Sequence, residues 1–340
     1  MKNKLIAVAR FLLFMGIGFF FIWLFLRNLS TDQRKEIMKS FGYANYWWIS
    51  LSVALGILSH YLRAIRWRML LEPMGYLPGK RNTFFAVMIG YIANLALPRL
   101  GEVSRCTVLT RYEGVPFNKS FGTVITERAI DLAMFVALFF LNLALQFDKL
   151  SNFIDAKVYT PLEQKFHLTM DLSGSLKLIA LGGIILVAII YFIFRKQIAR
   201  NKYFIKFWNM ALGFLEGIKS LVKVKRLWLF AFYSFSIWAL YLIMAYLVFF
   251  SLPETAHLGI DAGLAALVFG TIGIMVVQGG IGIYPAIVAE TLVLYSVVAT
   301  KGYALGWLIW SSQTITIIIL GGLSLIILPI IQKKKNYVEA

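Results

Sequence analysis

Residues 91–105 read Tyr-Ile-Ala-Asn-Leu-Ala-Leu-Pro-Arg-Leu-Gly-Glu-Val-Ser-Arg, an apolar run followed at once by a helix breaker and three charged side chains. Proline cannot continue a helix, because its nitrogen carries no hydrogen and its ring collides with the preceding turn. We therefore expect one helix to stop near Pro98 and a second to begin near Gly101. This stretch predicts a broken helix rather than a plain membrane crossing.

The chain around this stretch is too apolar for a water-soluble protein. Of its 340 residues, 60% are hydrophobic and only 15% are charged, and the mean hydropathy is +0.76. Soluble domains carry about 25% charged residues. The composition predicts an all-α polytopic membrane protein, folded as a single transmembrane domain over residues 1–340.

The net charge of +18 does not indicate a nucleic-acid partner. The basic residues lie in short stretches between apolar runs and form no single basic domain. We therefore expect them to set the orientation of the chain in the membrane and to attract anionic lipid. Cys106 is the only cysteine, and no Cys/His cluster has the spacing of metal ligands. We expect neither a metal site nor a cofactor.

Six apolar runs are long enough to cross about 30 Å of hydrocarbon as helices. Two further stretches, 83–97 and 262–300, are short or interrupted by glycine and proline. We expect these two to form broken, re-entrant hairpins, which gives about eight apolar segments. The six predicted spans are residues 5–26, 47–62, 129–147, 176–194, 227–252 and 303–331.

Charge asymmetry predicts the orientation, because Lys and Arg are retained on the cytoplasmic side. Segment 195–226 carries nine basic residues against one acid, and the tail carries three lysines at 333–335. We place both in the cytoplasm, together with the N-terminus, in the cell (inner or plasma) membrane. One signal conflicts with this orientation: the loop at 27–46, with four basic residues, would then lie outside.

The same reasoning makes stretch 83–128 begin and end inside and stretch 262–300 begin and end outside. Residues 1–147 then form one half, and 227–340 complete a second half that is inverted relative to the first. Residues 148–226 supply an outer loop, a span and a basic cytoplasmic segment. Eight ordinary helices are the alternative. Inverted repeats with discontinuous helices are a recurring plan of transporters, with the substrate site at the broken elements.

Three groups of residues are candidates for binding a substrate. Arg99 and Arg105 are suited to hold a phosphate, because a guanidinium offers a planar fork of donors, and a helix starting near Gly101 would add backbone amides. Glu102, three residues before Arg105, can pair with it on a helix. The alternative is a surface loop with arginines whose charged ends reach water.

The second group lies at the predicted start of the span at 129–147. Glu127 and Asp131 share one helical face, and Arg128 lies three residues before Asp131. These residues can neutralise Arg99 or Arg105 across the bundle, or carry protons. A purely structural ion-pair network is the alternative.

The third group is in the second broken stretch. Gly279, Gly280 and Gly282 precede Pro285 and permit a sharp turn and a close backbone approach to a ligand. Glu290 is the only acid in the apolar run that follows, a candidate partner for a basic headgroup or a proton. The alternative is a packing hinge with an interfacial glutamate.

Two other basic regions have simpler interpretations. Arg63, Arg66 and Arg68, beside Trp67, follow the second predicted span, and we interpret them as an interfacial anchor. Segment 195–226 alternates basic and apolar residues, which predicts an amphipathic helix on the inner membrane surface.

Together these motifs resemble the flippase-like transmembrane domain of lysylphosphatidylglycerol synthases, which also occurs as stand-alone membrane proteins. The likeness covers about residues 1–331. The matching signatures are Asn94-x-x-Leu97-Pro98-x-x-Gly101-Glu102-x-x-Arg105, then Glu127-Arg128-x-x-Asp131, then Gly279-Gly280-Ile281-Gly282.

The resemblance implies a role in moving or handling lipids between leaflets, and for some relatives a link to lipid-borne sugars. It also places Asn94 among the site residues. The synthases append a soluble aminoacyl-transferring domain, whereas this sequence ends nine residues after its last predicted span, so we do not expect aminoacylation. Gln278 and Tyr284-Pro285 depart from the pattern of the family, which often has Pro before Gly-Gly and Glu after the last glycine.

The leading hypothesis is a non-enzymatic translocator of an anionic phospholipid or lipid-linked phosphate precursor, with membrane lipids as its partners. An intramembrane transferase acting on lipid-linked sugars or headgroups, with Glu102 or Asp131 as base, is a second hypothesis. A membrane scaffold for envelope-synthesis enzymes, using the basic surface at 195–226, is a third.

Overall fold

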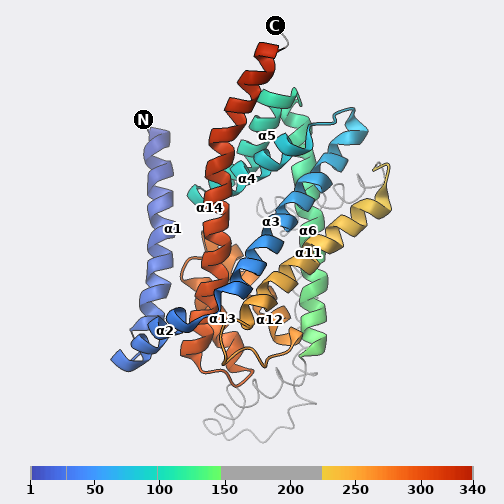
Figure 1. The fold of residues 1–340 in the computed structure, drawn as a ribbon. Coiled ribbons are helices and arrows are strands. Elements are labelled where there is room, and N and C mark those ends of the chain that lie inside the picture. The colour runs from blue at the N-terminus through green and yellow to red at the C-terminus, as the bar shows by residue number, and fades with distance from the viewer. Residues whose placement is uncertain (1, 28, 98, 147–223, 339–340) are drawn as a thin grey trace, which may run out of the picture.

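The computed structural model describes residues 2–27, 29–97, 99–146 and 224–338. Every regular element within these ranges is a helix, as expected of an all-α protein (Figure 1). The predicted outer loop at 148–175, the predicted span at 176–194 and nearly all of the basic segment at 195–226 lie outside the described residues.

Within the described part of the chain, four helices are long and apolar enough to cross a membrane. They occupy four of the six predicted spans. A fifth helix, α1 (Lys2–Leu26), forms at the predicted first span, with a described apolar part at Met15–Leu26. The protein is therefore a multi-pass membrane protein. The four long helices are α3 (Tyr46–Leu71), α6 (Phe117–Leu145), α11 (Leu227–Phe249) and α14 (Ala299–Val338).

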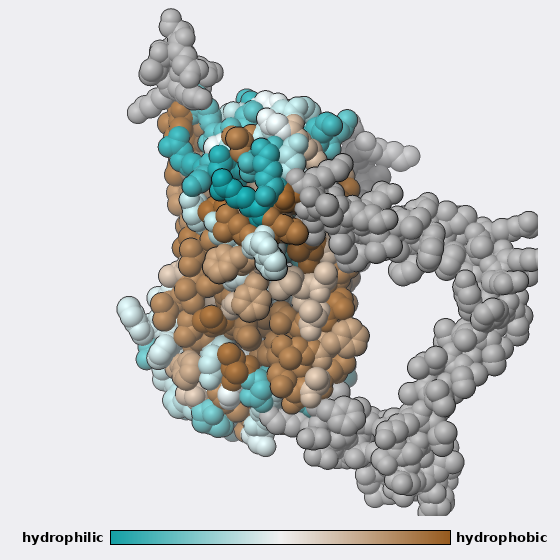
Figure 2. All heavy atoms as spheres, turned by 90° about the vertical axis from the view of Figure 1, so that its right-hand side faces the viewer, coloured by the Kyte–Doolittle hydropathy of each residue, from teal (hydrophilic) through white to brown (hydrophobic). Residues whose placement is uncertain are grey.

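The surface on the side of α6 and α11 agrees with a membrane environment. Figure 2 shows a broad hydrophobic band between two more hydrophilic ends. Large apolar side chains such as Phe140, Phe232 and Phe235 are more than half exposed there. Large exposed apolar areas are rare on soluble monomers, so lipid is the solvent that fits this face.

Two helices begin or end at different places from those predicted. The span expected at 129–147 begins twelve residues earlier, because α6 starts at Phe117. The helix expected at 47–62 continues to Leu71. Hydropathy marks only the apolar part of a helix, whereas backbone hydrogen bonding continues through polar turns. Glu127 and Asp131 therefore lie well inside α6 rather than at its start.

The predicted basic loop at 27–46 contains a helix, α2 (Thr31–Tyr43). Its start is a capping box, in which Ser30 Oγ accepts from the Gln33 amide at 3.2 Å and Gln33 Oε1 accepts from the Ser30 amide at 2.8 Å. Helix α2 lies across one end of the molecule, where α1 ends and α3 begins (Figure 1).

The stretch around Pro98 is broken as predicted. Helix α4 (Lys80–Ala96) is followed by α5 (Leu100–Glu113), and Arg99 between them has a left-handed φ of 64°. The two helices pack closely at Gly90 and Gly101, since a Cβ atom on Gly101 would overlap the Gly90 carbonyl oxygen. A short 3₁₀ turn, η1 (Glu72–Met74), precedes this first hairpin.

The second broken stretch forms a hairpin of α12 (Ile260–Val276), the 3₁₀ turn η4 (Gln278–Gly280) and α13 (Ile283–Val293). Gly279, Gly280 and Gly282 have φ values of 72°, 70° and 73°, where side chains are strained. Trp310 Nε1 donates to the Gly279 carbonyl at 2.6 Å. A Cβ on Gly282 would overlap the carbonyl oxygen of Gly18 in α1.

The two hairpins enter from opposite ends of the molecule (Figure 1). The first hairpin lies between the end of α3 and the start of α6. We call this end of the molecule the α5 end; α1 also begins there and α14 ends there. The second lies between the end of α11 and the start of α14, at the opposite end, which we call the α2 end. The tips meet inside, because the Cβ position of Gly279 lies 3.8 Å from Leu95 Cδ2.

Each hairpin has its own apolar core. Trp67 and Leu71 of α3 pack with Val87, Cys106 and Leu109 of the first hairpin. A larger cluster joins α13 and α14 to the ends of α3, α11 and α12, with members that include Ile49, Val248, Ala262, Val288 and Leu305.

We predict that Gly101→Ala weakens the first hairpin. Its methyl group cannot be accommodated without moving α4, and overpacking of this kind costs about 1–3 kcal/mol of unfolding free energy. Gly122→Ala in α6 is the matched control, because nothing lies within 4 Å of its Cβ position; it should be neutral or stabilising by up to about 1 kcal/mol. Thermal unfolding of the detergent-solubilised protein measures both, and equal melting temperatures would contradict the close packing.

Candidate functional site

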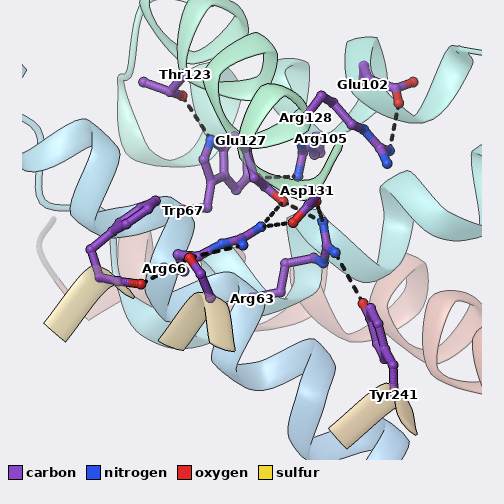
Figure 3. A network of polar contacts seen from close by, with 12 residues as sticks. Arg63, Arg66, Trp67, Glu102, Arg105, Thr123, Glu127, Arg128, Asp131 and Tyr241 are labelled. Carbon is purple, nitrogen blue, oxygen red and sulfur yellow. Dashed lines mark hydrogen bonds and ion pairs between the residues drawn. The ribbon is translucent and has the colours of Figure 1, made fainter. Parts of the chain in front are cut away.

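The candidate site is a buried ion cluster of five side chains from three helices: Arg63, Arg66, Arg105, Glu127 and Asp131 (Figure 3). Arg63 Nη1 lies 2.7 Å from Glu127 Oε1 and 2.7 Å from Asp131 Oδ2. Arg66 Nη2 lies 2.7 Å from Asp131 Oδ1 and 3.4 Å from Glu127 Oε1. Arg105 Nη1 reaches Glu127 Oε2 at 3.0 Å. All five side chains are nearly or completely excluded from solvent.

Helical spacing brings these groups together. Arg63 and Arg66 are three residues apart and share one face of α3, while Glu127 and Asp131 are four apart and share one face of α6. Glu127 is ten residues after the start of α6 at Phe117, which corresponds to about 15 Å along the axis. The cluster is thus deep within the helical bundle and not at the surface of either end.

A second layer of contacts holds the arginines in place. Arg63 Nη2 donates to Tyr241 Oη at 3.1 Å, and Arg66 Nη1 donates to Ser234 Oγ at 3.3 Å. The Arg105 guanidinium lies over the Trp67 ring, 4.6 Å from its centroid, a favourable contact for a cation. Helix α11 therefore takes part in the site through neutral side chains.

The five residues carry an uneven charge, since three guanidinium groups share two carboxylates. Arg105 Nη2 is buried and has no hydrogen-bond partner among the described residues. Burying a charge in a dry interior costs several kcal/mol unless it is paired. The cluster is therefore electropositive and retains buried donors without partners, since Nε of Arg63 and of Arg66 are in the same state as Arg105 Nη2; these properties suit an anionic ligand.

A cavity of about 290 Å³ lies where the hairpin tips meet. Leu95 from the first hairpin and Gly279 from the second both line it, together with Trp310 and Gln313 of α14. Tyr241 also lines it, so the phenol that accepts from Arg63 connects the cavity to the ion cluster.

The predicted site residues in the first half fall into three places. Arg105, Glu127 and Asp131 belong to the cluster. Glu102 pairs with Arg128 at 2.7 Å in a partly exposed bridge, so the alternative pairings that spacing allows, Glu102 with Arg105 and Arg128 with Asp131, are not the ones formed. The other two residues, Arg99 and Asn94, lie at the hairpin tip.

At that tip, Arg99 is exposed and precedes α5 without joining the cluster. Asn94 Oδ1 accepts from the Gly101 amide at 2.7 Å and so closes the hairpin. We predicted that both residues bind a ligand, and this stays a prediction; in the structure Arg99 is an exposed cation and the Asn94 amide closes the hairpin.

The predicted site residues of the second hairpin also lie in different places. Gly279 and Gly280 form the turn beside the central cavity, and Gly282 packs on α1. Glu290 is exposed at a separate apolar groove of about 660 Å³ between α1 and α13. It is not a member of the ion cluster.

Comparison with known proteins agrees with the resemblance seen in the motifs. The family described as "Lysylphosphatidylglycerol synthase TM region" matches residues 7–322. The chain belongs to this family. No solved structure matches it.

Two relatives of this family member share shorter regions with it. A UPF0104 membrane protein of Methanocaldococcus jannaschii is 28% identical over 134 residues, 38% of this chain and 39% of that protein. The glycosyltransferase AglD of Haloferax volcanii is 28% identical over 108 residues, 32% of this chain and 17% of that protein. The aligned regions thus cover well under half of each relative.

Arg63 and Arg66 of this family member were not among the predicted site residues. Their prediction as an interfacial anchor was wrong, because the two residues are 5% and 0% exposed. A usable signal was present: two arginines three apart and two acids four apart define complementary faces. Only the packing of α3 on α6 shows that these faces meet.

A second group of charges lies at the α2 end of this family member. Lys301 Nζ of α14 lies 3.2 Å from Glu36 in α2 and 3.0 Å from Glu254 in the loop after α11. Tyr43 Oη donates to Glu254 Oε1 at 2.7 Å. Burial alone would raise the pKa of Glu254, but hydrogen bonds from Tyr43 and Lys301 outweigh it and hold this pKa below its ordinary value.

Asp131→Asn should destabilise the protein strongly. It leaves Arg66 and Arg63 buried without a full counter-charge, and breaking a buried pair in this way costs about 3–5 kcal/mol. Arg128→Gln is the matched control, since the Arg128 side chain is 48% exposed and such bridges contribute at most about 1 kcal/mol. Equilibrium unfolding in mixed micelles compares them, and similar losses in both would contradict the buried cluster.

Glu254 should make stability depend on acid pH. Because its pKa is lower in the folded state, its contacts stabilise the fold above the ordinary glutamate pKa of about 4.3 and lose this effect as the pH falls through the folded value. The melting temperature of Glu254→Gln should therefore lie below that of the wild type at pH 7 and approach it near pH 3. Asp32→Asn, at an exposed site on α2, is the control; a gap for Glu254→Gln that does not change with pH would refute this.

Proposed function

We propose that the protein moves an anionic, phosphate-bearing lipid between the two leaflets and does not change it chemically. The observation that carries this proposal is the electropositive ion cluster beside the cavity where the two hairpin tips meet. Charged side chains at membrane depth are costly and usually functional. A phosphate is the ligand whose charge and acceptor oxygens match the surplus guanidinium.

The arrangement of the hairpins supports translocation. We infer that α3, the first hairpin and α6 correspond to α11, the second hairpin and α14 in an inverted repeat. In such a repeat both hairpins are re-entrant, and one faces each side of the membrane. Transporters of this plan expose a central site alternately to the two sides. Backbone at that depth is tolerated because it is packed in protein or lines a cavity.

The arginines would act in sequence. Arg99, exposed at the tip of the first hairpin, would meet a headgroup first. Arg105, with its buried free Nη2, would hold the phosphate inside, where a guanidinium is preferred to an ammonium for its planar fork. Glu127 and Asp131 would balance the remaining cations, and the Arg128–Glu102 pair would hold α5 against α6.

We further propose that the protein resides in the cell membrane with both termini in the cytoplasm. The start of α1 and the end of α14 lie at the same end of the molecule (Figure 1), which an even number of crossings requires. Lysines 333–335 favour the cytoplasmic side for that end. We expect membrane lipids, and not nucleic acid, to be the partners of a protein in this position.

The glycosyltransferase relative favours a second candidate, an intramembrane transferase acting on lipid-linked sugars. The geometry disfavours Asp131 as the general base of this reaction. A general base needs a carboxylate free to accept a proton, whereas both oxygens of Asp131 are bonded to arginines. Glu102 is paired with Arg128 through Oε1 only, and its Oε2 has no hydrogen-bond partner among the described residues. The mass of the recovered lipid distinguishes the two candidate functions, because a translocator leaves this mass unchanged and a transferase alters it.

Reconstitution into liposomes tests the proposal. Fluorescent phosphatidylglycerol should cross the bilayer in proteoliposomes faster than phosphatidylcholine with the same chains, as read by dithionite quenching. Arg105→Gln should slow phosphatidylglycerol by at least about tenfold, the value of one charge-assisted hydrogen bond, and Arg99→Ala should slow it as well. Arg111→Gln, exposed on the same helix, should not.

Two results would reject the assignment. One is no protein-dependent movement of either lipid. The other is an equal rate in the wild type and in both arginine variants. Mass spectrometry of lipids recovered from the same liposomes decides between translocation and transfer, since a new lipid mass would favour the transferase.

A further inference from the structure

A second apolar groove, of about 500 Å³, lies between α1, α2 and α14 at the α2 end. It is separate from the central cavity, because it uses Tyr303, Trp307 and Leu308 of α14, whereas the cavity uses Trp310 and Gln313. The rest of its apolar wall comes from Ile22, Leu26, Ile37, Met38 and Phe41.

One cation lines this groove. Arg34 of α2 is exposed, and its Nη2 donates to the carbonyl oxygen of Leu26 at 2.9 Å, at the last turn of α1. This bond places the guanidinium at the rim of the groove. Arg34 has no ion pair among the described residues. Its remaining donors are therefore available to a ligand at the rim.

The groove as a whole has the chemistry of an amphiphile site. Its wall can hold a hydrocarbon chain, and Tyr46 and Trp307, which also line it, are residues enriched where a membrane meets water. A cation at one rim complements a phosphate. We propose that this groove binds one anionic phospholipid, with the phosphate on Arg34 and an acyl chain between α1 and α14.

The proposal also gives a role to the basic stretch at 27–46. By charge asymmetry this stretch was the one signal that opposed the predicted orientation, with Arg27, Arg34, Lys35 and Lys39 on the side expected to be poor in cations. In the structure this stretch is largely helix α2, which lies across one end of the molecule. Cations on such a helix attract anionic headgroups wherever the helix lies. Lipid binding here does not require that the protein translocate anything.

Native mass spectrometry with defined lipids tests this site. The detergent-solubilised protein is equilibrated with dioleoyl phosphatidylglycerol or dioleoyl phosphatidylcholine, which share the same chains. The wild type should retain phosphatidylglycerol in preference to phosphatidylcholine, and the lipid that belongs to this groove is the one lost in the groove variants, apart from any lipid in the central cavity. Arg34→Gln should reduce that preference about fivefold, the effect of one cation near an anionic headgroup.

Two further variants locate the site. Lys39→Gln is the matched control, because Lys39 is exposed on the same helix but does not line the groove; it should keep the wild-type preference. Ser311→Trp fills the groove and should lower the number of retained lipids by one, whatever their headgroup. Melting temperatures near that of the wild type establish that each variant is folded.

Three outcomes would overturn the proposal. The first is equal retention of the two lipids by the wild type. The second is an unchanged preference in Arg34→Gln, or an equal loss in Lys39→Gln, which would indicate diffuse charge. The third is a lipid-free dimer, which would mean that a second copy of the chain covers the groove. None of these depends on a transport rate, so the test is independent of translocation.

Discussion

The structure depends on the mutual neutralisation of charges that have been withdrawn from water. Three arginines and two carboxylates meet between α3, α5 and α6, and each oxygen of Glu127 and Asp131 accepts from at least one guanidinium. An isolated charge in a dry interior is costly. A shift of these helices relative to one another would separate the charges and destabilise the protein. Tyr241 and Ser234 bring α11 under the same constraint. The geometry of the first hairpin follows from this requirement.

A second constraint acts on the backbone where the helices are broken. Amide and carbonyl groups that are buried where a helix breaks need hydrogen-bond partners inside the protein. The Asn94 side chain supplies one to the Gly101 amide, and the Trp310 indole supplies one to the Gly279 carbonyl. The two tips thus use the same device, a side chain from a neighbouring turn or helix. Because these backbone groups have hydrogen-bond partners, irregular backbone can line the central cavity.

Much of this architecture could be predicted from sequence because it depends on local chemistry. Pro98 and the glycines at 279–282 mark both breaks, and composition alone identifies the membrane class. The pairing of charges could not be predicted in the same way. Spacing along one helix allows Glu102 to pair with Arg105, but packing of α5 against α6 gives it Arg128 instead. Arg63 and Arg66 lie beyond the apolar run, yet the helix continues and buries them.

Helix α2 has a local sequence signal that a hydropathy profile does not detect. Ser30 and Gln33 have the spacing of a capping box, but the segment is too polar to stand out beside true spans. Its contacts with α14 join residues far apart in the sequence. They become visible only in three dimensions.

Helix α14 has 40 residues, a length of about 60 Å, which is twice the thickness of the hydrocarbon layer. It packs on α2 and α13 near one end and on α4 further along. A rod with these neighbours cannot tilt at one end without displacing the other. The two hairpins therefore pack on one continuous element, so a tilt of α14 would displace both.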